Sequence, residues 1–307
     1  MTLVFLAALA AVAWLAPAEP AAAAEPTPPG AGPLQPLITT SELVVGRNRF
    51  AFALARQGRL LAGAEVQVRV YDIRADVAQL AAVVPATYRR LETIEQGRQV
   101  HIHPDGSQHL HGTATDAQGI YVAQLALDRP GPWGIEIVAR HGSDPAEATR
   151  LTVTVLEAAR SPLPGTPAPR SRNLIASDVA DLRLIDTSEP PDPRLHQTRI
   201  ADAIQQRRPL IIVFATPKYC TSRVCGPVLD VVRTLMPAYA GQVAFVHQEI
   251  WADGRMETPA PTVTEWKLQT EPWIFLVDAD GVVRARFEGL ATRGEIEAAL
   301  RQMLRLE

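Results

Sequence analysis

The chain has 307 residues, which is longer than one ordinary domain and favours two. Its hydrophobic content of 47%, its charged content of 21% and its net charge of −3 are typical of a globular protein. No run rich in Lys and Arg is present, whereas phosphate binding needs a clustered basic surface. A nucleic-acid partner is therefore not expected.

The first 24 residues have the pattern of a secretory signal. An apolar run from Leu3 to Ala16 precedes small residues that offer a cleavage site near Ala24. No basic residue precedes the run, and its roughly 14 apolar residues are fewer than the ~20 that span a bilayer. We predict an extracytoplasmic protein that is secreted, periplasmic or tethered to the membrane by an uncleaved signal. Residues 25–36 are expected to form a Pro-rich tether.

Residues 37–158 are predicted to form an all-β domain. Apolar and polar residues alternate from Arg49 to Ile73, and three further strand patterns lie between Gly119 and Glu157. Short strands at this spacing predict an immunoglobulin-like β-sandwich. The phrases VGRNRFAFAL, GIYVAQLALDRPGPWGIEI and LTVTVLE resemble exported sandwich domains of the YtkA/FixH-like type. That resemblance implies no catalytic motif.

A second Pro-rich stretch, residues 159–175, is expected to be a linker, and the pattern changes after it. Strands and helices then alternate, which predicts an α/β domain over residues 176–307. The expected elements are a buried strand at Pro209–Thr216, a helix at Cys225–Tyr239, a strand at 242–251, a short helix at Pro261–Leu268, a hairpin turning at Asp280–Gly281 and a C-terminal helix capped by Thr292.

The two cysteines of the chain, Cys220 and Cys225, have four residues between them. In an exported protein such a pair is free to form a disulfide. In a regular helix their Cα atoms would lie ~7.5 Å apart along the axis, beyond the ~7 Å limit for a disulfide. Unless the first turn unwinds, Cys220 is expected in the loop before the helix, in agreement with Pro217 just upstream. A nearby helix N-terminus would stabilise its thiolate, which makes Cys220 the expected nucleophile and Cys225 the resolving thiol.

The order of elements, the dicysteine after the first central strand, Pro272 and Gly289 resemble the thioredoxin fold. The resemblance covers about residues 176–307 and is greatest to exported, cytochrome-maturation-type thioredoxin-like proteins. It implies a cis Pro272 that packs against the disulfide and shapes the substrate groove. It further implies thiol–disulfide exchange with protein thiols or disulfides of the extracytoplasmic space, with no cofactor required. The sandwich would then be a module that docks the partner.

Three residues depart from the thioredoxin pattern. Tyr219 stands where a Trp precedes the first cysteine, and Val213 stands where thioredoxins commonly have a buried Asp. Glu271, directly before Pro272, adds an acid close to the cysteines. Its carboxylate is interpreted either as a proton acceptor or as a charge that raises the thiol pKa by repulsion.

Two alternatives for the cysteines stay open. The pair can be a structural disulfide in a non-enzymatic binding module. The stretch CTSRVC also resembles the C-T-x-E-x-C motif of Q-type peroxiredoxins. Those peroxidases need a Thr where this chain has Pro217, and an Arg near the thiolate, for which Arg284 and Arg286 are the candidates on the expected hairpin.

A metal site is a further alternative, because four of the seven histidines lie close together in the sequence: His101, His103, His109 and His111. A hairpin centred on Gly106 would pair the first with the fourth and the second with the third, all on one face. Four converging imidazoles suit copper or zinc, whereas a solvent-facing polar hairpin binds neither. His247 falls in an expected strand and is interpreted as a core residue.

Overall fold

The computed structural model describes residues 33–306 except 75–76, 93, 96–97, 104, 106, 112–117, 221–223 and 253–255. The expected signal at residues 1–24 and most of the expected tether at 25–36 lie outside the described residues.

In the described part of the chain, nine strands follow the order β1-β3-β10-β6-β5-β11-β12-β2, with β4 beside β3. Neighbouring strands are antiparallel except β2 and β12. The strands are β1 (Gln35–Ile38), β2 (Leu43–Val44), β3 (Gly46–Arg56), β4 (Arg59–Leu60), β5 (Glu65–Arg74), β6 (Val77–Arg90), β10 (Gly119–Leu127), β11 (Gly131–Arg140) and β12 (Glu147–Leu156).

The long strand β6 makes this nine-stranded sheet curl on itself. Its residues 77–86 pair with β5, and its residues 87–90 pair with β10, so it belongs to both layers. Alternation along β3 directs Phe50, Phe52 and Leu54 into the enclosed core, where all three are fully buried. Ala51 on the same strand is also buried, because its side chain faces the other half of the molecule.

A second, four-stranded sheet has the order β14-β13-β15-β16, in which β13 and β14 alone are parallel. The five residues of β13 are all buried, as the continuous apolar run predicted. These strands are β13 (Leu210–Phe214), β14 (Ala244–Gln248), β15 (Trp273–Val277) and β16 (Val283–Glu288). The helices are the 3₁₀ turns η1 (Ala176–Asp178), η2 (Leu182–Leu184) and η3 (Pro193–His196), and α1 (Ile200–Gln205), α2 (Cys225–Tyr239), α3 (Pro261–Glu265) and α4 (Arg293–Leu304).

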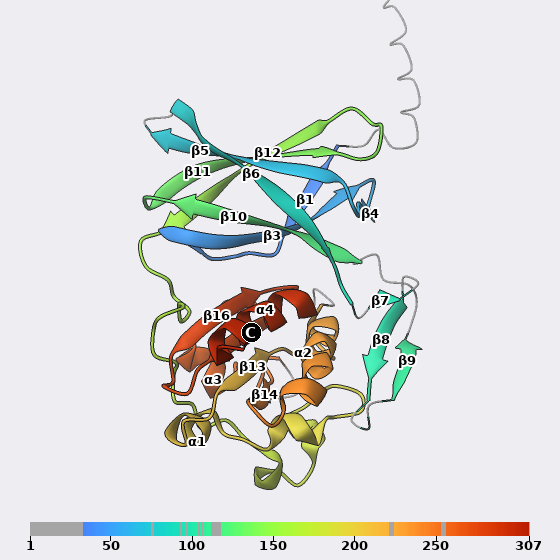
Figure 1. Cartoon of the computed structure of the whole chain (residues 1–307), viewed down its shortest axis with the longest axis vertical. Coiled ribbons are helices and arrows are strands. Elements are labelled where there is room, and N and C mark those ends of the chain that lie inside the picture. The colour runs from blue at the N-terminus through green and yellow to red at the C-terminus, as the bar shows by residue number, and fades with distance from the viewer. Residues whose placement is uncertain are drawn as a thin grey trace, which may run out of the picture.

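A small sheet of β7 (Ile94–Glu95), β8 (Arg98–Ile102) and β9 (Gln108–His111) completes the described strands. Its strand β8 lies against α2. Figure 1 shows it beside the four-stranded sheet and below the nine-stranded one.

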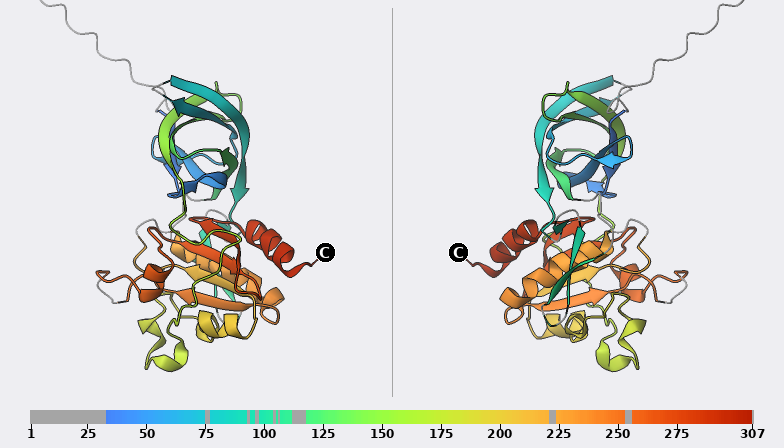
Figure 2. Two further views of the ribbon diagram at one scale, coloured as in Figure 1. Left: turned by 90° about the vertical axis from the view of Figure 1, so that its left-hand side faces the viewer. Right: turned by 90° about the vertical axis from the view of Figure 1, so that its right-hand side faces the viewer.

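The predicted fold class, an immunoglobulin-like sandwich followed by a distinct α/β thioredoxin-like domain, is wrong. The described chain is mostly β, with 40% strand and 20% helix, and α1 and α3 have only six and five residues. One hydrophobic cluster contains Ala51 and Val122 of the nine-stranded sheet together with residues of β13, α2 and α4. The two sheets therefore share a core, and the second is not a separate layered domain. Figure 2 shows the nine-stranded sheet stacked on the four-stranded half. The periodicity of each segment predicts its strands and helices, but it does not predict this shared core.

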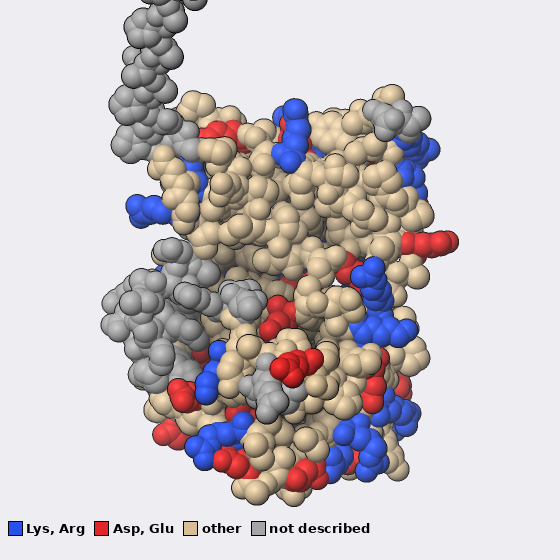
Figure 3. Space-filling view, turned by 180° about the vertical axis from the view of Figure 1, so that it is seen from behind, with Lys and Arg blue, Asp and Glu red and all other residues tan. Residues whose placement is uncertain are grey.

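Polar contacts reinforce the junction between the two sheets. Arg49 Nε on β3 lies 3.0 Å from Glu295 Oε1 on α4. Arg286 on β16 donates to Glu42 Oε1 at 2.8 Å, and the backbone N–H of Ser41 donates to Glu288 Oε2 at 2.9 Å. On the face seen in Figure 3, charged side chains of both signs gather over the four-stranded half, while the nine-stranded half is largely uncharged.

The Pro-rich stretch expected to be a linker is hydrogen-bonded along the four-stranded sheet. Gly165 N–H donates to the Val283 carbonyl at 2.8 Å, and Val283 N–H donates back to the Thr166 carbonyl at 2.9 Å. Ala168 N–H donates to the Gly281 carbonyl at 2.8 Å. This stretch therefore lies beside β16, along the outer edge of the four-stranded sheet.

Candidate functional site

Cys220 and Cys225 form a disulfide with their Cα atoms 6.0 Å apart. Cys225 is the first residue of α2, and Cys220 precedes the helix, which confirms the expected loop position of the first cysteine. The nearby helix N-terminus was expected to stabilise a thiolate at Cys220, but the helix begins at Cys225. The dipole of this 15-residue helix therefore favours a thiolate at Cys225.

Glu271 is the acid beside the disulfide. Its Oε2 lies 3.4 Å from Cys225 Sγ and accepts a hydrogen bond from the Thr216 backbone N–H at 3.0 Å. Burial raises the pKa of Glu271, and the nearby Glu249 carboxyl adds to this, while the Thr216 bond opposes it. A disulfide sulfur carries no proton, so in the oxidised protein the Glu271 carboxyl is the group that can hold one.

Pro272 is buried and follows Glu271 through a cis peptide bond, as the resemblance implied. Its carbonyl accepts a hydrogen bond from Gly289 N–H at 2.9 Å. The chain therefore brings three of the four predicted catalytic residues together, since donor atoms of Cys220, Cys225 and Glu271 all lie within 4.8 Å of one another, and Pro272 adjoins them in sequence.

The two cysteines differ in exposure. Cys220 is 8% exposed and Cys225 is fully buried. An incoming sulfur therefore reaches Cys220 first. A cleft of about 610 Å³ reaches Glu271 from outside, and apolar side chains of Ile250, Trp251 and Leu268 line part of it.

The four predicted metal-ligating histidines fall on the β8–β9 hairpin, in a register that differs from the predicted one. His101 pairs with His109, and His111 pairs with Gln99, a shift of two residues. The backbone N–H of His103 donates to the Ser107 carbonyl at 2.9 Å and closes the turn. The side chains of His101, His109 and His111 lie outside the described part of the structure, so the convergence of the four imidazoles stays a prediction.

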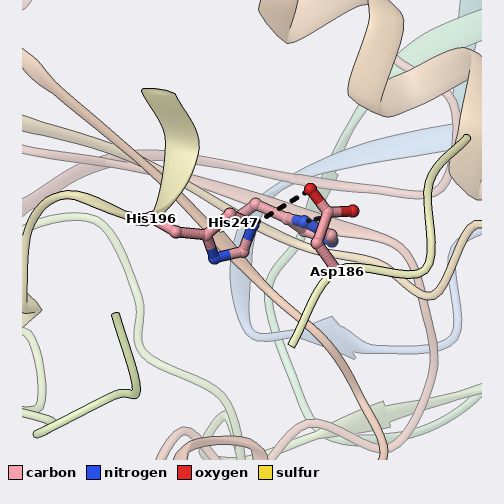
Figure 4. A group of neighbouring side chains, drawn as sticks. All are labelled: Asp186, His196 and His247. Atoms are coloured by element: carbon pink, nitrogen blue, oxygen red, sulfur yellow. Dashed lines mark hydrogen bonds and ion pairs between the residues drawn. The ribbon is translucent and has the colours of Figure 1, made fainter. Parts of the chain in front are cut away.

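A second cluster was missed by the sequence reasoning. The fully buried side chains of Asp186, His196 and His247 point toward one another (Figure 4). His247 is buried as expected for its strand, but it faces a carboxylate. Although burial opposes ionisation, the interactions with His247 and His196 hold the pKa of Asp186 well below its usual range. Asp186 lies in irregular structure and His196 ends the short 3₁₀ turn η3, and neither stretch has a sequence period that linked it to His247.

No protein-family model matches the chain, and neither does any curated protein. Among solved structures, the crystal structure of a DUF4426 family protein from Pseudomonas aeruginosa aligns with 13% identity and a TM-score of 0.23. The alignment covers 37% of this chain and 77% of that one. A likeness this weak decides nothing about fold or function.

None of the helices in the described ranges combines the length and the apolar character that crossing a bilayer requires. The Cys220–Cys225 disulfide is consistent with an oxidising compartment.

Proposed function

We propose that the chain is an extracytoplasmic thiol–disulfide oxidoreductase that acts on protein thiols or disulfides through Cys220 and Cys225. The observation that carries the proposal is the Glu271 carboxyl, 3.4 Å from Cys225 Sγ with a raised pKa. A structural disulfide needs no half-buried acid beside it, and taking a carboxyl partly out of water costs free energy. The proposed relation to thioredoxin-like proteins is limited to these site residues and Pro272, and does not extend to the fold.

The chemistry follows from the two sulfurs and the carboxylate. In the reduced protein, the Cys220 thiolate attacks one sulfur of a substrate disulfide, and the other substrate sulfur leaves as a thiolate. Cys225 then gives its proton to the Glu271 carboxylate and attacks Cys220 Sγ, which releases the second substrate thiolate. The substrate disulfide is reduced and the Cys220–Cys225 disulfide is formed. Oxidation of a substrate dithiol runs through the same steps in reverse, with Glu271 returning the proton to Cys225.

The cleft beside Glu271 supports a protein substrate. Its apolar lining residues Trp251 and Leu268 suit an extended segment that places an apolar side chain beside Glu271. In this proposal the nine-stranded sheet is the module that docks the partner, related to YtkA/FixH-like domains, and β6 exposes Val77, Leu80 and Val83 for such contact.

A structural disulfide in a binding module is the second candidate, and the burial of the cysteines favours it. With Cys225 fully buried and Cys220 8% exposed, access of a bulky thiol is limited. The peroxidase alternative has less support. Arg284 pairs with Asp278 at 2.5 Å and Arg286 pairs with Glu42 at 2.8 Å, so both candidate cations are engaged elsewhere.

A redox titration in glutathione buffers, read by thiol alkylation and mass spectrometry, tests the proposal. We expect a midpoint between about −270 and −120 mV, the range of exchange enzymes. Cys225→Ser should trap a mixed disulfide on Cys220, whereas Cys220→Ser should trap none. A midpoint below roughly −300 mV without any trapped adduct identifies a structural disulfide and rejects the oxidoreductase.

A further inference from the structure

The donor atoms of Asp186, His196 and His247 are spaced as ligands of one metal ion. His196 Nε2 lies 3.1 Å from Asp186 Oδ2, and His247 Nδ1 lies 3.6 Å from Asp186 Oδ1. One ligand atom from each of the three residues fits within 4.8 Å of the others. Two ligands held at the usual zinc distances at a tetrahedral angle are about 3.3 Å apart.

The tautomer of His247 leaves a lone pair facing the carboxylate. Its Nε2 lies 2.9 Å from the Ala215 carbonyl oxygen, which only accepts, so Nε2 carries the proton. Nδ1 is buried and has no hydrogen-bond partner among the described residues. The Asp186 oxygen that it faces is 3.6 Å away, beyond hydrogen-bond distance. Two buried acceptors that face each other need a positive species between them, either a metal ion or a second proton on the ring.

The surroundings match those of a metal site. Ligating imidazoles almost always donate their other N–H to a backbone carbonyl or a carboxylate, as His247 does to Ala215. Ligating carboxylates are themselves hydrogen-bonded. Asp186 Oδ1 accepts from Ser188 N–H at 2.9 Å, and Oδ2 accepts from Asp192 N–H at 2.8 Å. These bonds fix the carboxylate whether or not the ring nitrogens donate to it.

We infer that Asp186, His196 and His247 form a buried site for one divalent transition-metal ion, for which zinc is the best fit. Two imidazoles with one carboxylate suit Zn²⁺, whereas Ca²⁺ and Mg²⁺ prefer oxygen ligands alone. This site is separate from the His-rich hairpin and does not depend on the proposed redox function. An ion here would tie the irregular segment around 186–196 to β14. Through Ala215, it would also fix the residues that lead to Cys220.

The test is the metal content of the full-length chain, purified without a histidine tag and dialysed after loading with zinc. We expect about one zinc per chain by elemental mass spectrometry, and at least a tenfold loss in His247→Gln. Three variants should keep the metal: His141→Gln at an exposed turn, a Cys220→Ser/Cys225→Ser pair, and a hairpin variant with His101, His103, His109 and His111 changed to Gln. The Ser188 hydroxyl also donates to Asp186 Oδ1, at 2.5 Å, so Ser188→Ala should weaken zinc affinity about tenfold.

Loss of zinc in the hairpin or cysteine variant, with retention in His247→Gln, overturns the inference. A folded wild-type chain that retains no zinc also overturns it. If His247→Gln does not fold, cobalt substitution of the wild-type chain decides. The site predicts the visible bands of tetrahedral Co²⁺ without a thiolate-to-cobalt charge-transfer band, and their absence rejects it.

Discussion

At the scale of single residues, Glu271 is expected to control the resolving step of the proposed exchange. Glu271→Gln keeps the shape of the side chain and removes the proton acceptor at Cys225 Sγ. We expect resolution of the mixed disulfide to slow by about 10²–10⁴-fold, the usual contribution of general acid–base catalysis. Stopped-flow measurement with a peptide disulfide checks this, and Glu157→Gln at an exposed position is the matched control. Equal rates in both variants would remove Glu271 from the mechanism.

The same carboxyl should make stability depend on pH. Because burial raises the pKa of Glu271 above its ordinary 4.5, the folded chain holds this proton where the unfolded chain has released it. The Glu271 contribution to the free energy of unfolding is therefore greatest below pH 4.5 and falls as pH rises through the folded pKa. In urea unfolding at several pH values, the free energy of unfolding of Glu271→Gln should rise relative to that of the wild type as pH increases. A difference between the two free energies of unfolding that stays constant, or that moves in favour of the wild type as pH rises, would contradict this sign.

Some of this chemistry was predictable from local sequence, and some was not. The rise of a helix alone excluded a disulfide within regular helix and placed Cys220 before α2. The cluster of Asp186, His196 and His247 was out of reach, because its members come from β14 and an irregular segment that lies far from it in sequence. Only the folded chain brings them together.

At the scale of elements, the start of α4 depends on Thr292. Its hydroxyl accepts from Glu295 N–H at 3.3 Å, and Glu295 Oε2 accepts from Thr292 N–H at 3.2 Å, which together form a capping box. Thr292→Ala should lower the free energy of unfolding by about 1 kcal/mol, as measured in urea. Thr292→Ser should recover most of the loss. A Ser variant as unstable as the Ala variant would assign the effect to the buried methyl group instead.

Elements were predictable where one period or one cap dominates. The helix at 225–239 has the predicted bounds, and Thr292 caps the last helix as expected. The β8–β9 hairpin shows the limit. A two-residue shift keeps the alternation of faces intact, so the hydrophobic pattern could not distinguish the observed register from the predicted one.

At the scale of the whole molecule, the two sheets are expected to unfold together. An ion pair joins them, in which Arg286 Nη1 lies 2.8 Å from Glu42 Oε1. The two side chains are 13% and 7% exposed. Glu42→Gln and Arg286→Gln should each cost up to about 3 kcal/mol, because each leaves its partner poorly satisfied. A double-mutant cycle should give a coupling energy of about 0.5–3 kcal/mol, with a single calorimetric transition in every variant. Two separate transitions would show that the sheets unfold independently.

The shared core explains why the fold class was predicted wrongly while many elements were predicted correctly. Alternation marks Phe50 and Phe52 as core residues of one sheet, but it assigns the small Ala51 to the outer face. Only tertiary structure shows that Ala51 belongs to a buried cluster with residues of the second half. Sequence periodicity predicts which side of a strand is buried. It does not predict which element packs against that side.

The Pro-rich stretch between the sheets has a fixed length and does not act as a hinge. Its backbone bonds to Gly281 and Val283 fix how many residues fit between Ser161 and Ser171, although the Pro-rich composition is that of a linker. In an alignment of relatives, this stretch should therefore vary in residue identity while keeping its length. Insertions and deletions should instead collect in the turns at its two ends.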